Sequence, residues 1–305
     1  MAESPAGPRP AFAALPKSSV GYGLAAPAVA ALLALTALVT GVSGGDLAAA
    51  VYRVDLLRRV GLTVWDSGWY AGHWVLSYSV LFPPIGAALG ISLTDIACAA
   101  LASWAFDRLV TPRYGLVGRA ATGLFVLGTL VQVAAGRVPF LLGQALALLA
   151  LLAAQRRIWP LAFALATASS LSSPLAGAFL AIAALAWLLA DLPRRNLPVA
   201  CLLAAAVIPV AALGLIFPGQ GTMPFSLLDL SGMLAPLLAL ILLLDDSQRA
   251  LRLGAAIYGA AVLFCYLVPV SYTHLTSAPP ADRAPSWSAS GRSGASASRP
   301  SRRPR

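Results

Sequence analysis

Two charged residues follow the first apolar run of the chain at a spacing that suits chemistry on one helix face. Asp46 follows Gly44 and Gly45, and Arg53 lies seven residues further along, two helical turns on the same face. A carboxylate here can act as a general base, and a guanidinium beside it can bind an anionic phosphate. Asp46 also stands where a helix N-cap is expected, so the local sequence leaves the catalytic and the capping roles equally open.

Aromatic residues and a histidine follow in the stretch VWDSGWYAGHW, residues 64–74. The candidates for contact with a substrate are Trp65, Trp69, Tyr70 and His73. Their rings are suited to stacking against a sugar, although tryptophan and tyrosine are also typical of the aromatic belt at a membrane surface. Because His73 has no Cys or Glu near it in the sequence, we expect it to form hydrogen bonds, and we predict no metal site from it.

The other acidic residues and the cysteines favour structural roles. Asp55 is spaced for an ordinary surface ion pair with Arg58 or Arg59. We expect Asp95 to cap a helix at the external surface, and Asp229 is a weaker second carboxylate near the external end of a later span. Three cysteines lie in apolar runs without metal-ligand spacing: Cys98, Cys201 and Cys265.

The elements that must position these residues are apolar helices. The chain is 59% hydrophobic and 10% charged, whereas soluble domains carry about 25% charged residues. Its mean hydropathy is +0.81. We therefore predict an all-α, polytopic transmembrane helix bundle of about nine spans. The expected spans lie at roughly 24–42, 92–107, 117–135, 140–154, 158–172, 174–190, 197–217, 225–244 and 254–270.

The section 43–91 between the first two spans is predicted to be an external structure on the membrane. Residues 46–60 have the apolar spacing of an amphipathic helix. Residues 79–90 are apolar but too short to span, and Pro83-Pro84 interrupts them, which indicates an interfacial or re-entrant segment.

The arginines indicate the orientation. A cytoplasmic N-terminus places most arginine-containing loops of this multi-pass protein on the cytoplasmic side of a bacterial plasma membrane, as the positive-inside bias favours. Arg53 and Arg137 are then among the few external arginines, which favours a functional role for them. The net charge of +10 gives no reason to expect nucleic acid, because residues 271–305 hold six arginines against one aspartate.

The chain is expected to divide into three parts. Residues 1–23 are predicted to be a disordered cytoplasmic segment, 24–270 the membrane domain, and 271–305 a disordered basic tail. The stretch VSYTHLT at 270–276 looks like a translated sequencing-library adapter. We therefore expect the tail to be non-native read-through and the natural protein to continue differently; an ordinary low-complexity tail is the alternative.

Three stretches together resemble the start of bacterial GT-C-type membrane glycosyltransferases, in the actinobacterial and archaeal branch. They are GGDLAAAVYRVDLLRRVG (44–61), WDSGWYAGH (65–73) and YSVLFPP (78–84). The segment GRVPFLLGQALALLALL (136–152) is also similar to one that recurs in these proteins. The residues that match the pattern are Asp46, Arg53, Gly61, Trp65, Trp69, Tyr70, Gly72, Tyr78, Pro83 and Pro84.

The resemblance implies an enzyme that transfers a sugar from a polyprenyl-phosphate donor to an external lipid or glycan acceptor. It implies that Asp46 acts as the base or as a metal ligand, so a divalent cation stays open as a cofactor. Arg53 and Arg137 would hold the lipid phosphate. The sugar pocket would be lined by Trp65, Trp69, Tyr70 and His73.

Two alternatives stay open at this point. A transporter or flippase is one, because FDRLVTPRYGLVGR (106–119) loosely resembles a cytoplasmic loop of major-facilitator transporters. Against it, no span carries a charge at its centre and no internal repeat is evident. A non-catalytic integral membrane protein is the other alternative.

Overall fold

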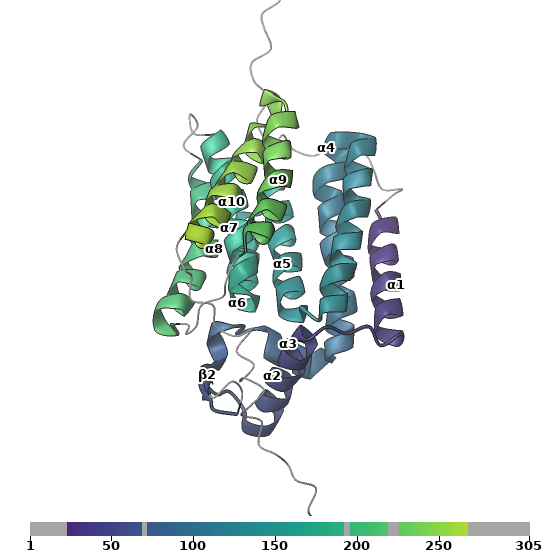
Figure 1. Cartoon of the computed structure of the whole chain (residues 1–305), viewed down its shortest axis with the longest axis vertical. Helices are drawn as coiled ribbons and strands as arrows, with labels where there is room; N and C mark the ends of the chain where they lie inside the picture. The colour runs from purple at the N-terminus through teal and green to yellow at the C-terminus, as the bar shows by residue number, and fades with distance from the viewer. Residues whose placement is uncertain (1–22, 69–71, 192–195, 219–225, 268–305) are drawn as a thin grey trace, which may run out of the picture.

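Long apolar helices lie side by side in the computed structural model, which describes residues 23–68, 72–191, 196–218 and 226–267 (Figure 1). These helices are α1 (Ala25–Val39), α4 (Ile91–Ala135), α5 (Val138–Gln155), α6 (Trp159–Ser172), α7 (Pro174–Ala190), α8 (Leu197–Ile216), α9 (Leu227–Leu243) and α10 (Arg249–Leu267). The all-α prediction is confirmed, apart from one pair of two-residue strands. The predicted segments 1–23, except Gly23, and 271–305 lie outside the described residues.

The longest helix, α4, folds back on itself. Gly115 has φ 57° and ψ −124°, a backbone conformation that interrupts the helix. Phe106 stacks on Phe125 with ring centroids 4.2 Å apart, and the hydroxyl of Thr122 donates to Asp107 Oδ1 at 3.4 Å. Both contacts require the two halves to run antiparallel. The two apolar segments predicted at 92–107 and 117–135 are therefore the two arms of a helical hairpin.

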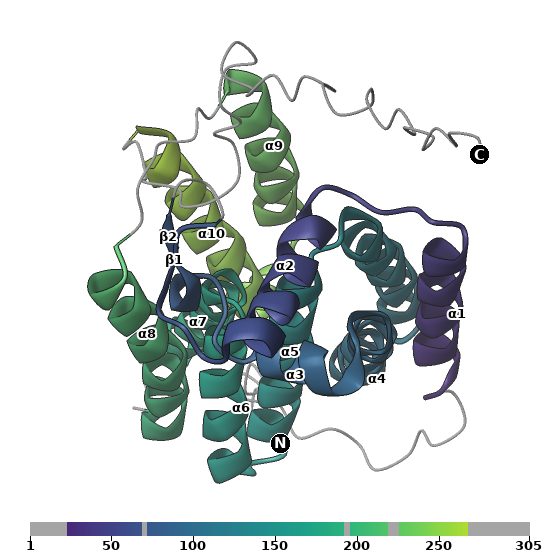
Figure 2. The same ribbon diagram turned by 90° about the horizontal axis from the view of Figure 1, so that it is seen from below.

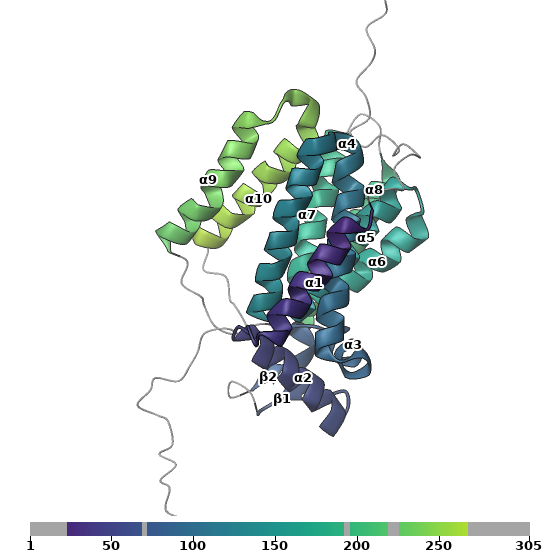
Figure 3. The ribbon, with the colours of Figure 1, turned by 90° about the vertical axis from the view of Figure 1, so that its right-hand side faces the viewer.

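Each of the predicted apolar segments forms a helix, but the count of spans is not confirmed. Within the described residues, four helical segments are long and apolar enough to cross a membrane, which indicates a membrane protein: Ile91–Ala135, Val138–Gln155, Leu197–Ile216 and Asp246–Leu267. Three shorter apolar helices are α1, α7 and α9. The last of these pairs with α10 along one side of the bundle (Figure 3).

The section 43–91 covers one end of the bundle (Figures 1 and 2). It contains α2 (Asp46–Val60), the strands β1 (Trp65–Asp66) and β2 (His73–Trp74), the short helix η1 (Val75–Ser77) and α3 (Phe82–Leu89). The predicted amphipathic helix 46–60 is confirmed. The prediction that Pro83 and Pro84 interrupt the next segment is wrong. Both occupy the first turn of α3, where proline is well tolerated.

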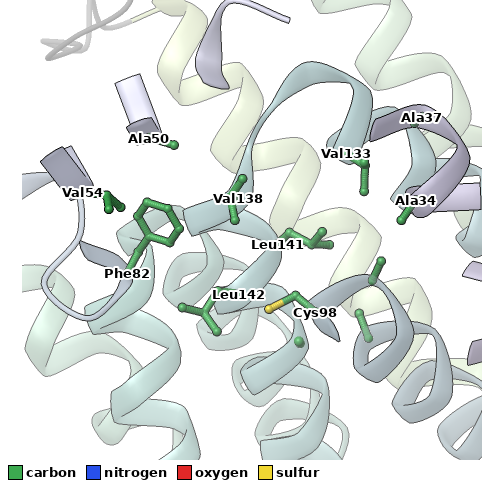
Figure 4. Close-up of a cluster of buried hydrophobic side chains, with 13 residues drawn as sticks. Ala34, Ala37, Ala50, Val54, Phe82, Cys98, Val133, Val138, Leu141 and Leu142 are labelled. Atoms are coloured by element: carbon green, nitrogen blue, oxygen red, sulfur yellow. The ribbon is translucent and has the colours of Figure 1, made fainter. Parts of the chain in front are cut away.

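This end section shares a core with the bundle. Val54 of α2 and Phe82 of α3 belong to the same buried cluster as Cys98 of α4 and Leu141 of α5 (Figure 4). A second cluster, rich in alanine, joins α5, α6, α7 and α8. Burying the two side chains from α2 and α3 against the bundle fixes the section that carries the candidate site.

Candidate functional site

Asp46 and Arg137, 91 positions apart in the sequence, form an ion pair. Arg137 Nε donates to Asp46 Oδ2 at 2.8 Å. Asp46 is the first residue of α2, and Arg137 stands immediately before α5. Two of the residues predicted to carry the chemistry are thus brought together at the end of the bundle.

Two glycines make this contact possible, because the backbones come very close here. Gly44 N donates to the carbonyl of Ala134 at 2.7 Å, and a Cβ on Gly44 would stand 2.7 Å from the carbonyl oxygen of Ala135. Gly136 has φ +76°, and a Cβ on it would stand 2.7 Å from Leu47 Cα. The segment before α2 and the turn between α4 and α5 are therefore held against each other by glycine-only contacts.

The capping role considered for Asp46 is wrong. The N-cap of α2 is Gly45, and no side chain caps this helix. The carboxylate of Asp46 binds Arg137 instead, and its negative charge is favourable in the first turn of a helix. The Asp46 side chain is 18% exposed and that of Arg137 is 53% exposed, so the pair lies at the boundary between protein and surroundings.

Arg53 stands two helical turns beyond Asp46 on the same face of α2 and is buried, with 2% of the residue exposed. Its Nη1 donates to the carbonyl of Ala49 at 3.0 Å, and its guanidinium carbon lies 3.9 Å from the centre of the Tyr78 ring. Burial raises the pKa of the Tyr78 phenol; the positive charges of Arg53 and Arg137 act to lower this pKa, and the negative charge of Asp46 to raise it. Three predicted site residues therefore act on one phenol.

The strand pair holds Trp65 and His73. Trp65 pairs with Trp74 and Asp66 with His73. Asp66 Oδ2 accepts a hydrogen bond from the Tyr52 hydroxyl at 2.7 Å, which ties the strand pair to α2 and raises the pKa of Tyr52. His73 is buried, whereas Trp65 is about half exposed.

The two tryptophans of the strand pair connect it to the end of α8 through ring contacts. Trp65 contacts Trp74 edge-on at 4.8 Å between ring centroids, and Trp74 contacts Phe217 at 5.6 Å. Trp69 and Tyr70 lie outside the described residues, so their proposed part in a sugar pocket stays a prediction.

Two other acidic residues, Asp55 and Asp229, have structural roles. Asp55 forms the expected surface ion pair with Arg58, at 3.9 Å. Asp229 is a capping residue: its carboxylate accepts from the backbone and hydroxyl of Ser226. No group of three or more His, Cys, Asp or Glu side chains that could hold a metal ion exists among the described residues, and Asp46 has a guanidinium as its ion-pair partner.

The expectation for Asp95 is wrong. Gly90 is the N-cap of α4, and Asp95 lies inside the helix with 2% of the residue exposed. Its Oδ1 forms no hydrogen bond within the described part of the chain. The sequence had one signal for this, since Asp95 is followed by an unbroken run of small and apolar residues that a surface cap does not need.

No protein-family model matches the chain, and neither a curated protein nor a solved structure matches it. The likeness to membrane glycosyltransferases therefore depends on the residues quoted for it alone.

Proposed function

We propose that the protein is a membrane glycosyltransferase that moves a sugar from a polyprenyl-phosphate donor to an external lipid or glycan acceptor. The observation that supports this most is the Asp46–Arg137 ion pair with Arg53 close by. It offers a carboxylate for the acceptor, the half-exposed guanidinium of Arg137 for a phosphate, and the positive charge of the buried Arg53 behind them. The pair lies at the end of a bundle of apolar helices, where a lipid-linked donor can arrive.

The proposed reaction uses each group once. The acceptor hydroxyl oxygen forms a bond to the anomeric carbon while Asp46 takes its proton. The bond from that carbon to the phosphate oxygen breaks, and its electron pair leaves with the polyprenyl phosphate, whose charge Arg137 and Arg53 stabilise. Exposed ion pairs contribute only about 0–1 kcal/mol, so the half-exposed Arg137 can turn from Asp46 to the phosphate at small cost and free the base.

The distribution of arginines supports an external site. The turns at the end of the bundle away from α2 carry Arg113, Arg119, Arg156 and Arg157. By the positive-inside bias, that end faces the cytoplasm and the Asp46 end faces outward. The N-terminus is then cytoplasmic in a multi-pass protein of the bacterial plasma membrane.

Release of polyprenyl phosphate tests the proposal. The full chain, reconstituted in vesicles with a bacterial lipid extract as acceptor, is incubated with a panel of polyprenyl-phosphate sugars. We expect at least one donor to release polyprenyl phosphate with time, measured by mass spectrometry, together with a glycosylated lipid. Release from none of the donors would exclude this function for the chain.

A transporter or flippase is the second candidate, and Asp95 is the observation that favours it. A buried carboxylate within an apolar helix often marks an ion pathway. Replacement of Asp95 by Asn separates the two candidates. Flux into vesicles that the unaltered chain supports and Asp95→Asn abolishes, with no sugar transfer by the unaltered chain, would favour the transporter.

A further inference from the structure

We infer that Tyr78 is a positioning residue of this site, whose ring holds the Arg53 guanidinium beside the Asp46–Arg137 pair. The inference rests on the proposed function for one step, the assignment of Arg53 to the donor phosphate. Tyr78 matches the motif of the family, but its role follows from the contacts of its ring.

Such a support suits Arg53 because its charge is almost fully removed from water. Burying a guanidinium costs free energy unless it is compensated by hydrogen bonds and nearby electron-rich groups. The carbonyl of Ala49 supplies one acceptor from within α2. The Tyr78 ring face, 3.9 Å from the guanidinium carbon, supplies a cation–π contact, which is stronger in a desolvated site than at an exposed one.

The backbone that follows Tyr78 is held from two sides, which restricts where the ring can lie relative to Arg53. Ser79 is fully buried, and its hydroxyl accepts a hydrogen bond from Phe82 N at the start of α3, at 3.1 Å. The next two amides, of Val80 and Leu81, both donate to the carbonyl of Leu171 on α6, at 2.8 and 3.2 Å. The residues directly after Tyr78 thus link this section to the end of α6.

The electrostatics connect Tyr78 to all three charged residues. The charges of Arg53, Asp46 and Arg137 each influence its phenol. A ring that fixes Arg53 at this place also fixes the distance from that cation to the ion pair, and hence how strongly its charge attracts a phosphate bound at Arg137. The ring face carries this role, so the hydroxyl is not needed for it.

A double-mutant cycle on phosphate binding tests the inference. The probe is geranyl phosphate, a water-soluble short-chain prenyl phosphate, titrated calorimetrically into the detergent-purified full chain. Arg53→Ala should weaken binding about tenfold, because it removes one positive charge near the bound phosphate. Tyr78→Leu should weaken it by a similar factor, and the double variant should bind no more weakly than either single one, because both changes remove one unit.

Tyr78→Phe is the matched control, since it keeps the ring and should bind within about twofold of the unaltered chain. A merely structural role would not give this pattern of rescue and non-additivity. If Tyr78→Leu does not yield folded protein, Tyr78→Met, which is flexible and of similar size without an aromatic face, takes its place with the same expected loss.

The possible results distinguish a failure of the role of Tyr78 from a failure of the proposed phosphate site. Normal binding by Tyr78→Leu or Tyr78→Met, with weakened binding by Arg53→Ala, would overturn the role of Tyr78 and leave the proposed function standing. Weak binding by Tyr78→Phe would overturn the role of the ring. Unchanged binding by Arg53→Ala, or no binding by the unaltered chain, would contradict the phosphate site itself and remove what Tyr78 is proposed to position.

Discussion

At the scale of single residues, the ion pair of Asp46 and Arg137 is a weak contact for stability but a strong one for chemistry. Arg137 is half exposed, so its attraction to Asp46 is largely screened. The same guanidinium, directed at a leaving phosphate in a drier site, is worth much more. The two effects of removing it should therefore differ greatly in size.

We predict that Arg137→Gln lowers sugar transfer about 100-fold or more while changing the free energy of unfolding by less than about 1 kcal/mol. Transfer assays in vesicles and thermal unfolding in detergent measure the two quantities. Arg58→Gln, at the surface ion pair with Asp55, is the control and should alter neither. Normal transfer by Arg137→Gln would show that this guanidinium has no part in the reaction.

Tyr78 should make the protein less stable to unfolding at alkaline pH. Burial raises the pKa of its phenol above the ordinary value of 10.0, so the folded protein keeps this proton to a higher pH than the unfolded chain does. Above pH 10.0 the unfolded chain holds fewer protons, and the free energy of unfolding falls as the pH rises.

Tyr78→Phe removes this titration, so its melting temperature should fall less steeply than that of the unaltered chain above pH 10.0. The measurement is a series of thermal unfolding curves from neutral to alkaline pH. Parallel declines for the two proteins would contradict the burial of this phenol.

Much of the residue-scale site was visible in the sequence, and the reasons for the misses are physical. Asp46 and Arg53 share a helix, so their spacing predicts their proximity. The addition of Arg137 needs a contact across 91 positions, which no local pattern specifies. The sequence names Tyr78 only as a residue of the matching pattern and predicts no contact with Arg53, because cation–π stacking on a buried arginine depends on the fold.

At the scale of elements, glycines decide where α2 meets the turn before α5. Gly136 combines a left-handed conformation with contact to the backbone of Leu47. A side chain at this position would both strain the turn and push the start of α2, with Asp46, away from Arg137. The site should therefore be sensitive to a single methyl group outside it.

We predict that Gly136→Ala destabilises the protein by at least about 1–2 kcal/mol, the cost of a left-handed conformation for a residue with a Cβ, and lowers transfer as well. Gly128→Ala is the matched control. It lies within α4, where a Cβ would meet nothing within 4 Å, and alanine there should be neutral or stabilising. Thermal unfolding compares them; equal stability would show that the close contact at Gly136 is not needed.

The helices themselves were largely predictable, because apolar runs bounded by Gly, Pro and Arg define them. The ends of α7 and α9 agree with the expected ranges within a few residues. Pro83 was misread because a proline pair breaks a helix only from its interior, and here the helix starts at that point. The prediction for Asp95 fails because the burial of one side chain in the first turns of a helix depends on which elements pack against it, which the local sequence does not specify.

At the scale of the whole molecule, the account requires the two ends of the bundle to face opposite sides of a membrane. The count of about nine spans depends on that arrangement, and hydropathy alone could not fix it, because several helices are shorter than a full crossing. Two exposed residues can report which side of the membrane each end faces. They are Asp55 of α2 and Arg156 at the end of α5.

We predict that Asp55→Cys reacts with a membrane-impermeant maleimide in intact bacteria, and that Arg156→Cys reacts only after the cells are opened. Both variants are made after the native cysteines Cys98, Cys201 and Cys265 are replaced by alanine. Labelling in the reverse order would place the Asp46 end in the cytoplasm and exclude an external acceptor.

The central claim is that Asp46 is the base of a sugar transfer, and the most direct test compares Asp46→Asn with Asp55→Asn. Asparagine keeps the size of the side chain and removes the proton acceptor. We predict that Asp46→Asn lowers transfer from a polyprenyl-phosphate donor by at least about 100-fold at unchanged protein level, while Asp55→Asn transfers normally. Near-normal transfer by Asp46→Asn would contradict the account.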